Sequence, residues 1–263
     1  MKSRAPATVP ATLPPLTRRM LGWEIVVVFG VSLGASALYA IINLIASLTA
    51  PKALAKQHAI LVGSLAPGRP LLDLTLQLAS ILTTLVPVAL VFYLLAREGE
   101  GPSALGLDIT QPVKDIARGA VLAAIIGGSG LALYLAAFHL GISLNVVPET
   151  LPNVWWRIPV LVLDAAQNGI LEEIIVLGYL LRRLDQLGWV PWKAIALAAV
   201  VRGSYHLYQG FGGFIGNAIL GVIFGVLYKR WGRVTPMIIA HTLIDTGAFV
   251  GYALLHGHVS WLP

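Results

Sequence analysis

Long apolar segments, separated by short polar ones, alternate along almost the whole of this chain. A helix needs about 20 mostly apolar residues to cross a hydrocarbon core of about 30 Å. The pattern therefore predicts an all-α fold, a polytopic bundle of transmembrane helices. About seven spans are expected, at approximately 22–48, 71–95, 117–139, 158–181, 191–208, 212–228 and 235–255.

The composition points to the same class of protein. Hydrophobic residues make up 57% of the 263 positions and charged residues only 11%, whereas about 25% of the residues in soluble domains are charged. The chain has no cysteine, which excludes a disulfide framework, a thiolate metal site and a cysteine nucleophile. Any catalysis must therefore use Glu, Asp, His, Ser or Tyr side chains.

The 18 Lys and Arg residues give a formal net charge of +6, but they lie in short clusters between the apolar runs. This distribution argues against a nucleic-acid partner and is typical of topology signals. Most of these residues fall in cytoplasmic segments if the N-terminus is cytoplasmic, so this orientation is predicted. Residues 1–20, rich in Pro, Ala and Thr, are expected to form a disordered cytoplasmic segment before a transmembrane domain at 21–263.

Two adjacent carboxylates, Glu172 and Glu173, interrupt an otherwise apolar span. A charged side chain at the centre of a bilayer costs on the order of 3 kcal/mol, so such residues usually face the bundle interior and serve a function. At helical spacing Glu172 shares a stripe with Asp164 and Asn168, whereas Glu173 lies about 100° away. The two carboxylates are therefore expected to contact different partners.

Two further spans each carry a pair of polar residues four positions apart. Arg202 and His206 lie in the fifth predicted span, and His241 and Asp245 lie in the seventh. Residues at i and i+4 share one helix face, and the three polar faces are expected at overlapping depths, most easily reached from the cytoplasmic half. The sequence therefore predicts one common polar site.

A buried carboxylate beside an imidazole can hold a water molecule and accept its proton. Carboxylates and neutral imidazoles also bind zinc, so Glu172, His206, His241 and Asp245 are candidate ligands of a divalent metal such as zinc. A second histidine can hold the oxyanion of a tetrahedral intermediate. Amide hydrolysis is the reaction that this set suits best, although each residue alone is equally consistent with helix packing or a structural ion pair.

The order and spacing of these residues resemble the CAAX-processing and bacteriocin-processing (CPBP, or Abi) family of intramembrane proteases. The family pattern is Glu-Glu-x-x-x-Arg, then Phe-x-x-x-His, then His-x-x-x-Asn or Asp, on three successive helices. The resemblance covers about residues 158–250 and rests on Glu172, Glu173, His206, His241 and Asp245. It implies that Glu172 and His206 activate the catalytic water, while His241 and Asp245 complete the site through oxyanion or ligand contacts.

Two positions depart from that pattern. The family arginine is expected at 177, where this chain has Leu177, and the family phenylalanine at 202, where it has Arg202. Our interpretation is that Arg202 is the charge partner that Leu177 cannot provide for Glu173. The opposite interpretation is a site that has lost catalysis.

The leading prediction is an intramembrane endopeptidase that hydrolyses a peptide or membrane-protein substrate with a Glu/His-activated water, with or without a metal. One alternative is a catalytically inactive protein of the same fold that acts as a binding or assembly subunit. Another is a proton-coupled carrier, in which the carboxylates and histidines form a relay. Membrane lipids are the expected surroundings, and a prokaryotic plasma membrane is the expected location because no organelle signal is found.

Overall fold

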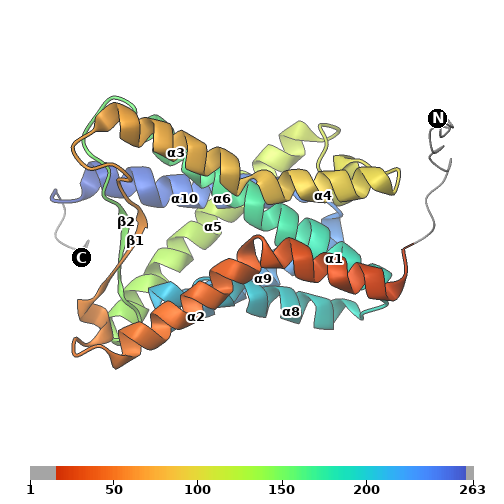
Figure 1. The fold of residues 1–263 in the computed structure, drawn as a ribbon, viewed down its shortest axis with the longest axis horizontal. Coiled ribbons are helices and arrows are strands. Elements are labelled where there is room, and N and C mark those ends of the chain that lie inside the picture. The colour runs from red at the N-terminus through yellow and green to blue at the C-terminus, as the bar shows by residue number, and fades with distance from the viewer. Residues whose placement is uncertain (1–15, 259–263) are drawn as a thin grey trace, which may run out of the picture.

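Residues 16–258 are described by a computed structural model (Figure 1). Most of them are helical, as the hydropathy pattern predicted. Residues 1–15, which hold most of the segment expected to be disordered, lie outside the described part of the chain. The longer helices are α1 (Arg18–Gly30), α2 (Leu33–Thr49), α3 (Pro70–Thr84), α4 (Val86–Arg97), α5 (Pro112–His139), α6 (Arg157–Glu172), α8 (Pro191–Ser204), α9 (Phe211–Trp231) and α10 (Thr235–Leu255).

Within the described residues, four helical runs are long and apolar enough to cross a membrane: Pro70–Arg97, Pro112–His139, Phe211–Trp231 and Thr235–Leu255. The pair of α1 and α2 makes a fifth candidate, bent by 55° at its break. These helices indicate an integral membrane protein. The count of seven spans and the cytoplasmic N-terminus remain predictions.

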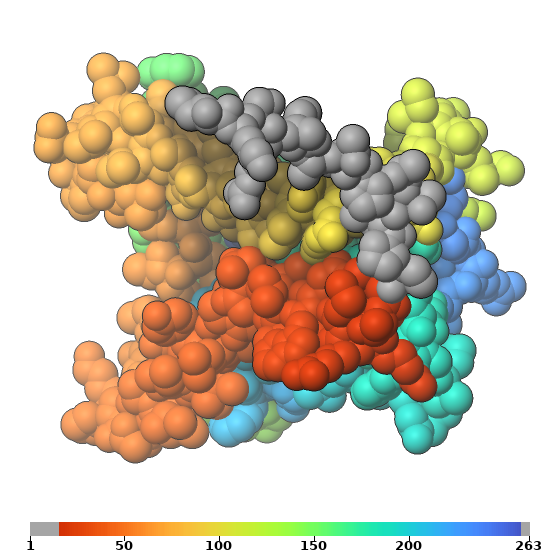
Figure 2. Space-filling model, turned by 45° about the vertical axis from the view of Figure 1, so that its right-hand side comes forward, coloured from red at the N-terminus to blue at the C-terminus, as the bar shows by residue number. Residues whose placement is uncertain are grey.

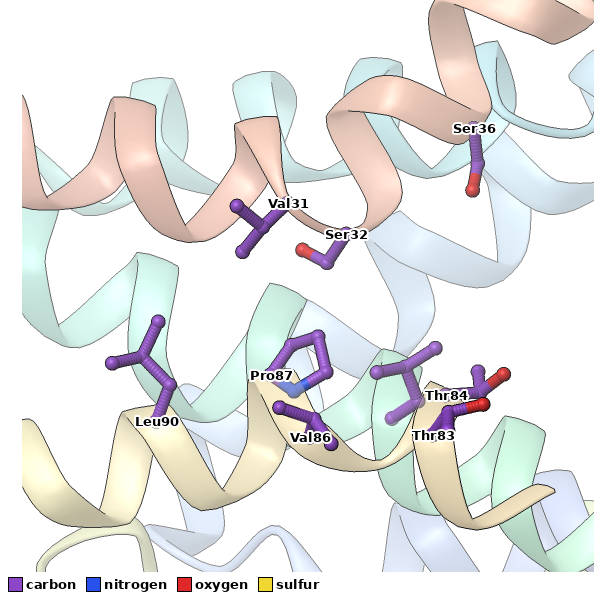
Figure 3. A pocket seen from close by; sticks show the side chains of 9 residues that line it. Val31, Ser32, Ser36, Thr83, Thr84, Val86, Pro87 and Leu90 are labelled. Carbon is purple, nitrogen blue, oxygen red and sulfur yellow. The ribbon is translucent and has the colours of Figure 1, made fainter. Parts of the chain in front are cut away.

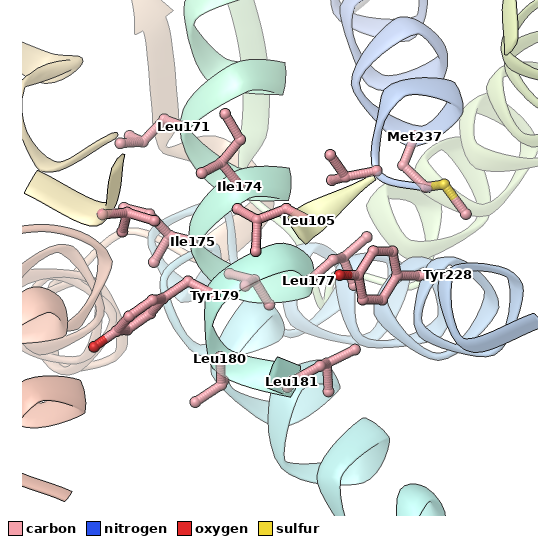
Figure 4. Packing of buried hydrophobic residues seen from close by; sticks show 14 of the residues in the cluster. Leu105, Leu171, Ile174, Ile175, Leu177, Tyr179, Leu180, Leu181, Tyr228 and Met237 are labelled. Atoms are coloured by element: carbon pink, nitrogen blue, oxygen red, sulfur yellow. The ribbon is translucent and has the colours of Figure 1, made fainter. Parts of the chain in front are cut away.

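α6 continues without a gap into η3 (Glu173–Leu180) and then α7 (Leu181–Gln186). η3 is a π-helix, whose wider turns often occur at functional sites. All eight residues of η3 are buried, and its apolar side chains pack with Leu105, Tyr228 and Met237 (Figure 4). Glu173 is the first residue of η3, so a buried carboxylate lies next to the apolar core of the bundle.

A two-stranded parallel sheet was not predicted by the sequence, and the all-α prediction is wrong in this detail. β1 (His58–Val62) pairs with β2 (Asn145–Glu149), with His58 opposite Asn145. The two strands lie at the end of the bundle opposite the start of α1 (Figure 1). Strands of five residues within polar connections give little periodic signal, which explains why hydropathy missed them.

Two helical runs break at facing positions. The chain leaves helical geometry at Ser32, between α1 and α2, and α4 begins one residue before Pro87, which has no backbone N–H. A cavity of about 430 Å³ lies between the two breaks, with Ser32 and Ser36 across from Thr83 and Thr84 (Figure 3). In the space-filling view, α1 and α2 lie below α3 and α4 on this face (Figure 2).

Glycines permit close approaches between helices of the bundle. A Cβ atom on Gly169 of α6 would lie 2.7 Å from Thr242 Oγ1 of α10 and 3.1 Å from the Ile238 carbonyl oxygen. A Cβ atom on Gly221 of α9 would lie 2.8 Å from Ala199 Cα of α8. In a membrane, such small residues let helix backbones pack directly against each other. These contacts pack α6 closely against α10, and α8 closely against α9.

Arg233 links two connections between helices. Its guanidinium donates hydrogen bonds to both carboxylate oxygens of Asp115, the shortest at 2.6 Å. It also donates to both carboxylate oxygens of Asp108, at 3.0 and 3.1 Å. Asp108 belongs to the connection that precedes α5, and Arg233 lies directly before α10. The start of α10 is therefore fixed to the start of α5.

Candidate active site

Glu172 and Glu173 lie at the junction of α6 and η3. Glu172 is 8% exposed and Glu173 is completely buried. Burial of a carboxylate requires hydrogen-bond donors or an opposite charge, because its desolvation is otherwise too costly. The surrounding helices provide both.

Arg202, in the last turn of α8, contacts both carboxylates. Its Nη1 donates to Glu173 Oε1 at 2.7 Å, and its Nη2 lies 3.3 Å from Glu172 Oε2. Leu177 is completely buried among apolar side chains of the core (Figure 4). One guanidinium from α8 therefore lies where Glu173 needs a positive partner, while position 177 contributes only apolar packing.

His241 of α10 approaches the same carboxylate. Its Nδ1 lies 2.8 Å from Glu173 Oε1 and 3.2 Å from Arg202 Nη2. A guanidinium cannot accept a hydrogen bond, and the shorter contact is to the carboxylate, so we assign the Nδ1 proton to the Glu173 bond. The other ring nitrogen, Nε2, lies 3.5 Å from Asp245 Oδ2.

His206 does not lie on the helix that the sequence predicted for 191–208. α8 ends at Ser204, and His206 lies in the turn before the short 3₁₀ helix η4 (Leu207–Gln209). The expectation that Arg202 and His206 share a helix face is therefore wrong. The turn nevertheless brings His206 Nε2 to 3.7 Å from Glu172 Oε2.

Three neighbouring side chains were missed as site residues. Tyr205 is buried and donates its hydroxyl proton to Glu172 Oε2 at 2.8 Å, while Gln209 Nε2 lies 3.3 Å from His206 Nδ1. Asn168 Nδ2 donates to Asp245 Oδ2 at 3.2 Å. The sequence placed Asn168 on the Glu172 stripe, and this was a usable signal. No periodic signal marked Tyr205 or Gln209, because both lie beyond the end of α8.

The residues do not fit a divalent metal. Among the described residues, no three His, Asp or Glu side chains form a group that could hold an ion. The guanidinium of Arg202 already lies among the donor atoms of Glu172, Glu173 and His241. A cation bound there would be repelled by this permanent charge. The four residues predicted as zinc ligands, Glu172, His206, His241 and Asp245, therefore do not suit a zinc ion.

Residues 153–247 match the protein-family model described as Type II CAAX prenyl endopeptidase Rce1-like. The matched range includes all of α6, η3, α8 and α9 and the first part of α10, and it contains the five motif residues. The comparisons with curated proteins and with solved structures gave no match. The resemblance to the CPBP intramembrane proteases is thus confirmed by the Rce1-like family over residues 153–247.

Proposed function

We propose that this protein is an intramembrane endopeptidase that hydrolyses a peptide bond with a water molecule activated by Glu172. The observation that carries the proposal is the 3.7 Å approach of His206 Nε2 to Glu172 Oε2. This pair lies within the segment that matches a family of CAAX prenyl endopeptidases. A carboxylate and an imidazole at this separation can bind one water molecule between their free hydrogen-bonding positions.

The hydrogen bond with Gln209 assigns the proton of His206. The amide nitrogen donates to Nδ1, so a neutral His206 carries its proton on Nε2, on the side of Glu172. A water molecule can then accept from His206 Nε2 and donate to Glu172. Its oxygen lone pair is directed away from both, towards a substrate carbonyl.

Glu172 accepts the water proton as the water oxygen bonds to the carbonyl carbon. The carboxylic acid then returns this proton to the leaving nitrogen as the C–N bond breaks. Tyr205 holds Glu172 through Oε2 during both transfers. The reaction balances with water as the only co-reactant.

Glu173, Arg202 and His241 support this pair rather than reacting. Their contacts of 2.7 and 2.8 Å join η3, α8 and α10 through a single oxygen, Glu173 Oε1. Arg202 also neutralises part of the charge near Glu172. On its other side, His241 Nε2 lies 3.5 Å from Asp245 Oδ2, which accepts a hydrogen bond from Asn168.

We also infer seven crossings with the N-terminus in the cytoplasm of a prokaryotic cell. The α1–α2 and α3–α4 pairs, α5, the α6–η3–α7 run, α8 together with the turn at His206 and η4, α9 and α10 each cross once. The clusters of Lys and Arg support this orientation, because they favour the cytoplasmic side. β1 and β2 then lie on the outer side of the membrane.

Purified protein in liposomes should cleave members of a pool of synthetic peptides that contain an apolar segment, with new termini identified by mass spectrometry. In ¹⁸O-labelled water, one heavy oxygen should enter each new carboxylate. Glu172→Gln and His206→Ala should lower cleavage by about 10²–10⁴-fold. Asp185→Asn, an exposed carboxylate of α7, is the matched control. Cleavage that survives Glu172→Gln would contradict the proposal.

A further inference from the structure

A second cavity lies near the strands, separate from the one between the helix breaks. It has a volume of about 400 Å³ and is bounded by the C-terminal part of α2, by β1 and by Tyr208 of η4. We call it the strand cavity. Its polar lining residues are Asn43, Ser47, Gln57, His58 and Tyr208.

A chain of hydrogen-bonding groups connects the strand cavity with the candidate site. Gln209 Nε2 donates to the Tyr208 hydroxyl at 3.0 Å and lies 3.3 Å from His206 Nδ1. The rings of His206 and Tyr208 are stacked with their centroids 6.3 Å apart. His206 in turn lies beside Glu172. Each step is a direct contact between side chains.

Two buried polar atoms near this chain have no hydrogen-bond partner among the described residues. One is His206 Nε2, and the other is Asn145 Oδ1, from the residue that pairs with His58 of the cavity wall. A buried polar atom without a partner destabilises the folded protein, and internal water molecules usually bond such atoms. Water molecules at these two positions would satisfy both atoms.

The backbone around His206 supports the same conclusion. α8 has 14 residues, so it is about 21 Å long and too short for a hydrocarbon core of about 30 Å. Non-helical backbone at membrane depth is tolerated only where it is buried in protein or lines a water-filled cavity. The turn at His206 and η4 packs against α2 and reaches the strand cavity through Tyr208.

We propose that the strand cavity is a water-filled vestibule that delivers the hydrolytic water to Glu172 and His206, with Tyr208 and Gln209 as positioning residues along the route. This rests on the proposed peptidase function and adds the side from which water arrives. The cavity between the helix breaks is lined, on the side of α6, by the apolar side chain of Leu171, which precedes Glu172 in the sequence. The water route therefore opens on the side of β1.

Because the sequence has no cysteine, an introduced cysteine is the only thiol that a maleimide can label. Ser47→Cys and the matched control Ser36→Cys, which lines the other cavity, are reconstituted in liposomes and treated with a water-soluble maleimide. Labelling of the Ser47→Cys variant should be rapid and should lower its cleavage of the peptide pool by about tenfold or more relative to the same unlabelled variant. Labelled Ser36→Cys should retain its unlabelled rate. No labelling at position 47, no loss after labelling, or an equal or larger loss at position 36 overturns the proposal.

Gln209→Leu tests the positioning role with a different readout. It should lower kcat with little change in KM, because His206 loses the partner that sets its proton and ring orientation. Gln209→Asn, which keeps an amide hydrogen-bond donor for His206 Nδ1, should recover part of kcat. Equal kcat values for the two variants would contradict the role. If Glu172→Gln left cleavage intact while position 47 labelled rapidly, the proposed role of Glu172 as the base would fail and the hydrated vestibule would stand.

Discussion

Arg202 Nη1 lies 2.7 Å from Glu173 Oε1, and both side chains are completely buried. Removing one partner of such a pair leaves an uncompensated charge in the core, which typically costs about 3–5 kcal/mol. Arg202→Leu should therefore destabilise the protein by about this amount, measured by thermal unfolding in detergent. Arg202→Leu combined with Glu173→Gln should recover much of the loss. Equal instability of the single and double variants would contradict the pairing.

Restoring an arginine at position 177 tests whether the charge has moved between helices. Leu177→Arg should recover folding and expression of Arg202→Leu, because it returns a guanidinium to the neighbourhood of Glu173. Leu177→Arg alone should destabilise the protein, since it adds a second charge to an apolar cluster. Absence of rescue would count against the relocation of the charge partner.

Tyr205→Phe removes the hydroxyl that bonds Glu172 Oε2 at 2.8 Å. A hydrogen bond to a charged group is worth about 1.5–3 kcal/mol, so kcat should fall by about 10–100-fold. KM should change little, because the hydroxyl touches the proposed base rather than the substrate. Tyr228→Phe, in the apolar cluster of η3 and α9, is the control and should leave kcat unchanged. Equal effects of the two variants would assign Tyr205 a packing role only.

Gly169→Ala should push α6 away from α10. The added Cβ would lie 2.7 Å from Thr242 Oγ1 and 3.1 Å from a backbone oxygen, and such overpacking costs about 1–3 kcal/mol. Because α6 continues directly into η3, which carries Glu173, and α10 carries His241, cleavage should fall together with the melting temperature. Gly128→Ala of α5, where the added atom meets nothing within 4 Å, should be neutral or slightly stabilising.

The Arg233 contacts predict a dependence of stability on pH. Hydrogen bonds from Arg233, followed by those from Thr110, hold the pKa of Asp108 well below its ordinary value. A carboxyl group with a depressed folded pKa adds stability above its unfolded pKa of about 3.9, and this is lost as the pH falls through the folded pKa. The melting temperature of Arg233→Leu should therefore be lower than that of the wild type at pH 5–8.

The same difference should shrink below about pH 4, as Asp108 becomes protonated in the unfolded chain and then in the folded one. Arg230→Leu, which replaces an exposed arginine near the end of α9, is the control. The melting temperature of Arg230→Leu should equal that of the wild type across the whole pH range. A constant deficit of Arg233→Leu down to about pH 2 would mean that Asp108 does not contribute.

Hydropathy predicted the helical bundle because long apolar runs have few other stable forms in lipid. The proximity of Glu173 to Arg202 was also within reach of the sequence, since an unpaired arginine in an apolar span needs an anion. The turn at His206 could not be predicted, because the helix-like sequence pattern of the span continues past Ser204, where α8 ends. Tyr205 and Gln209 were missed for this reason, as contacts made by a turn follow no helical period.

The pairing of β1 with β2 has a mechanical consequence for α2. It ties the loop after α2 to the loop after α5, so the C-terminal end of α2 is anchored, while its N-terminal end begins at a 55° bend. A rigid-body tilt of α2 would therefore pivot near the strands and displace the Ser36 end most. Such a tilt would widen the gap beside Leu171 and leave the wall that faces Tyr208 almost still.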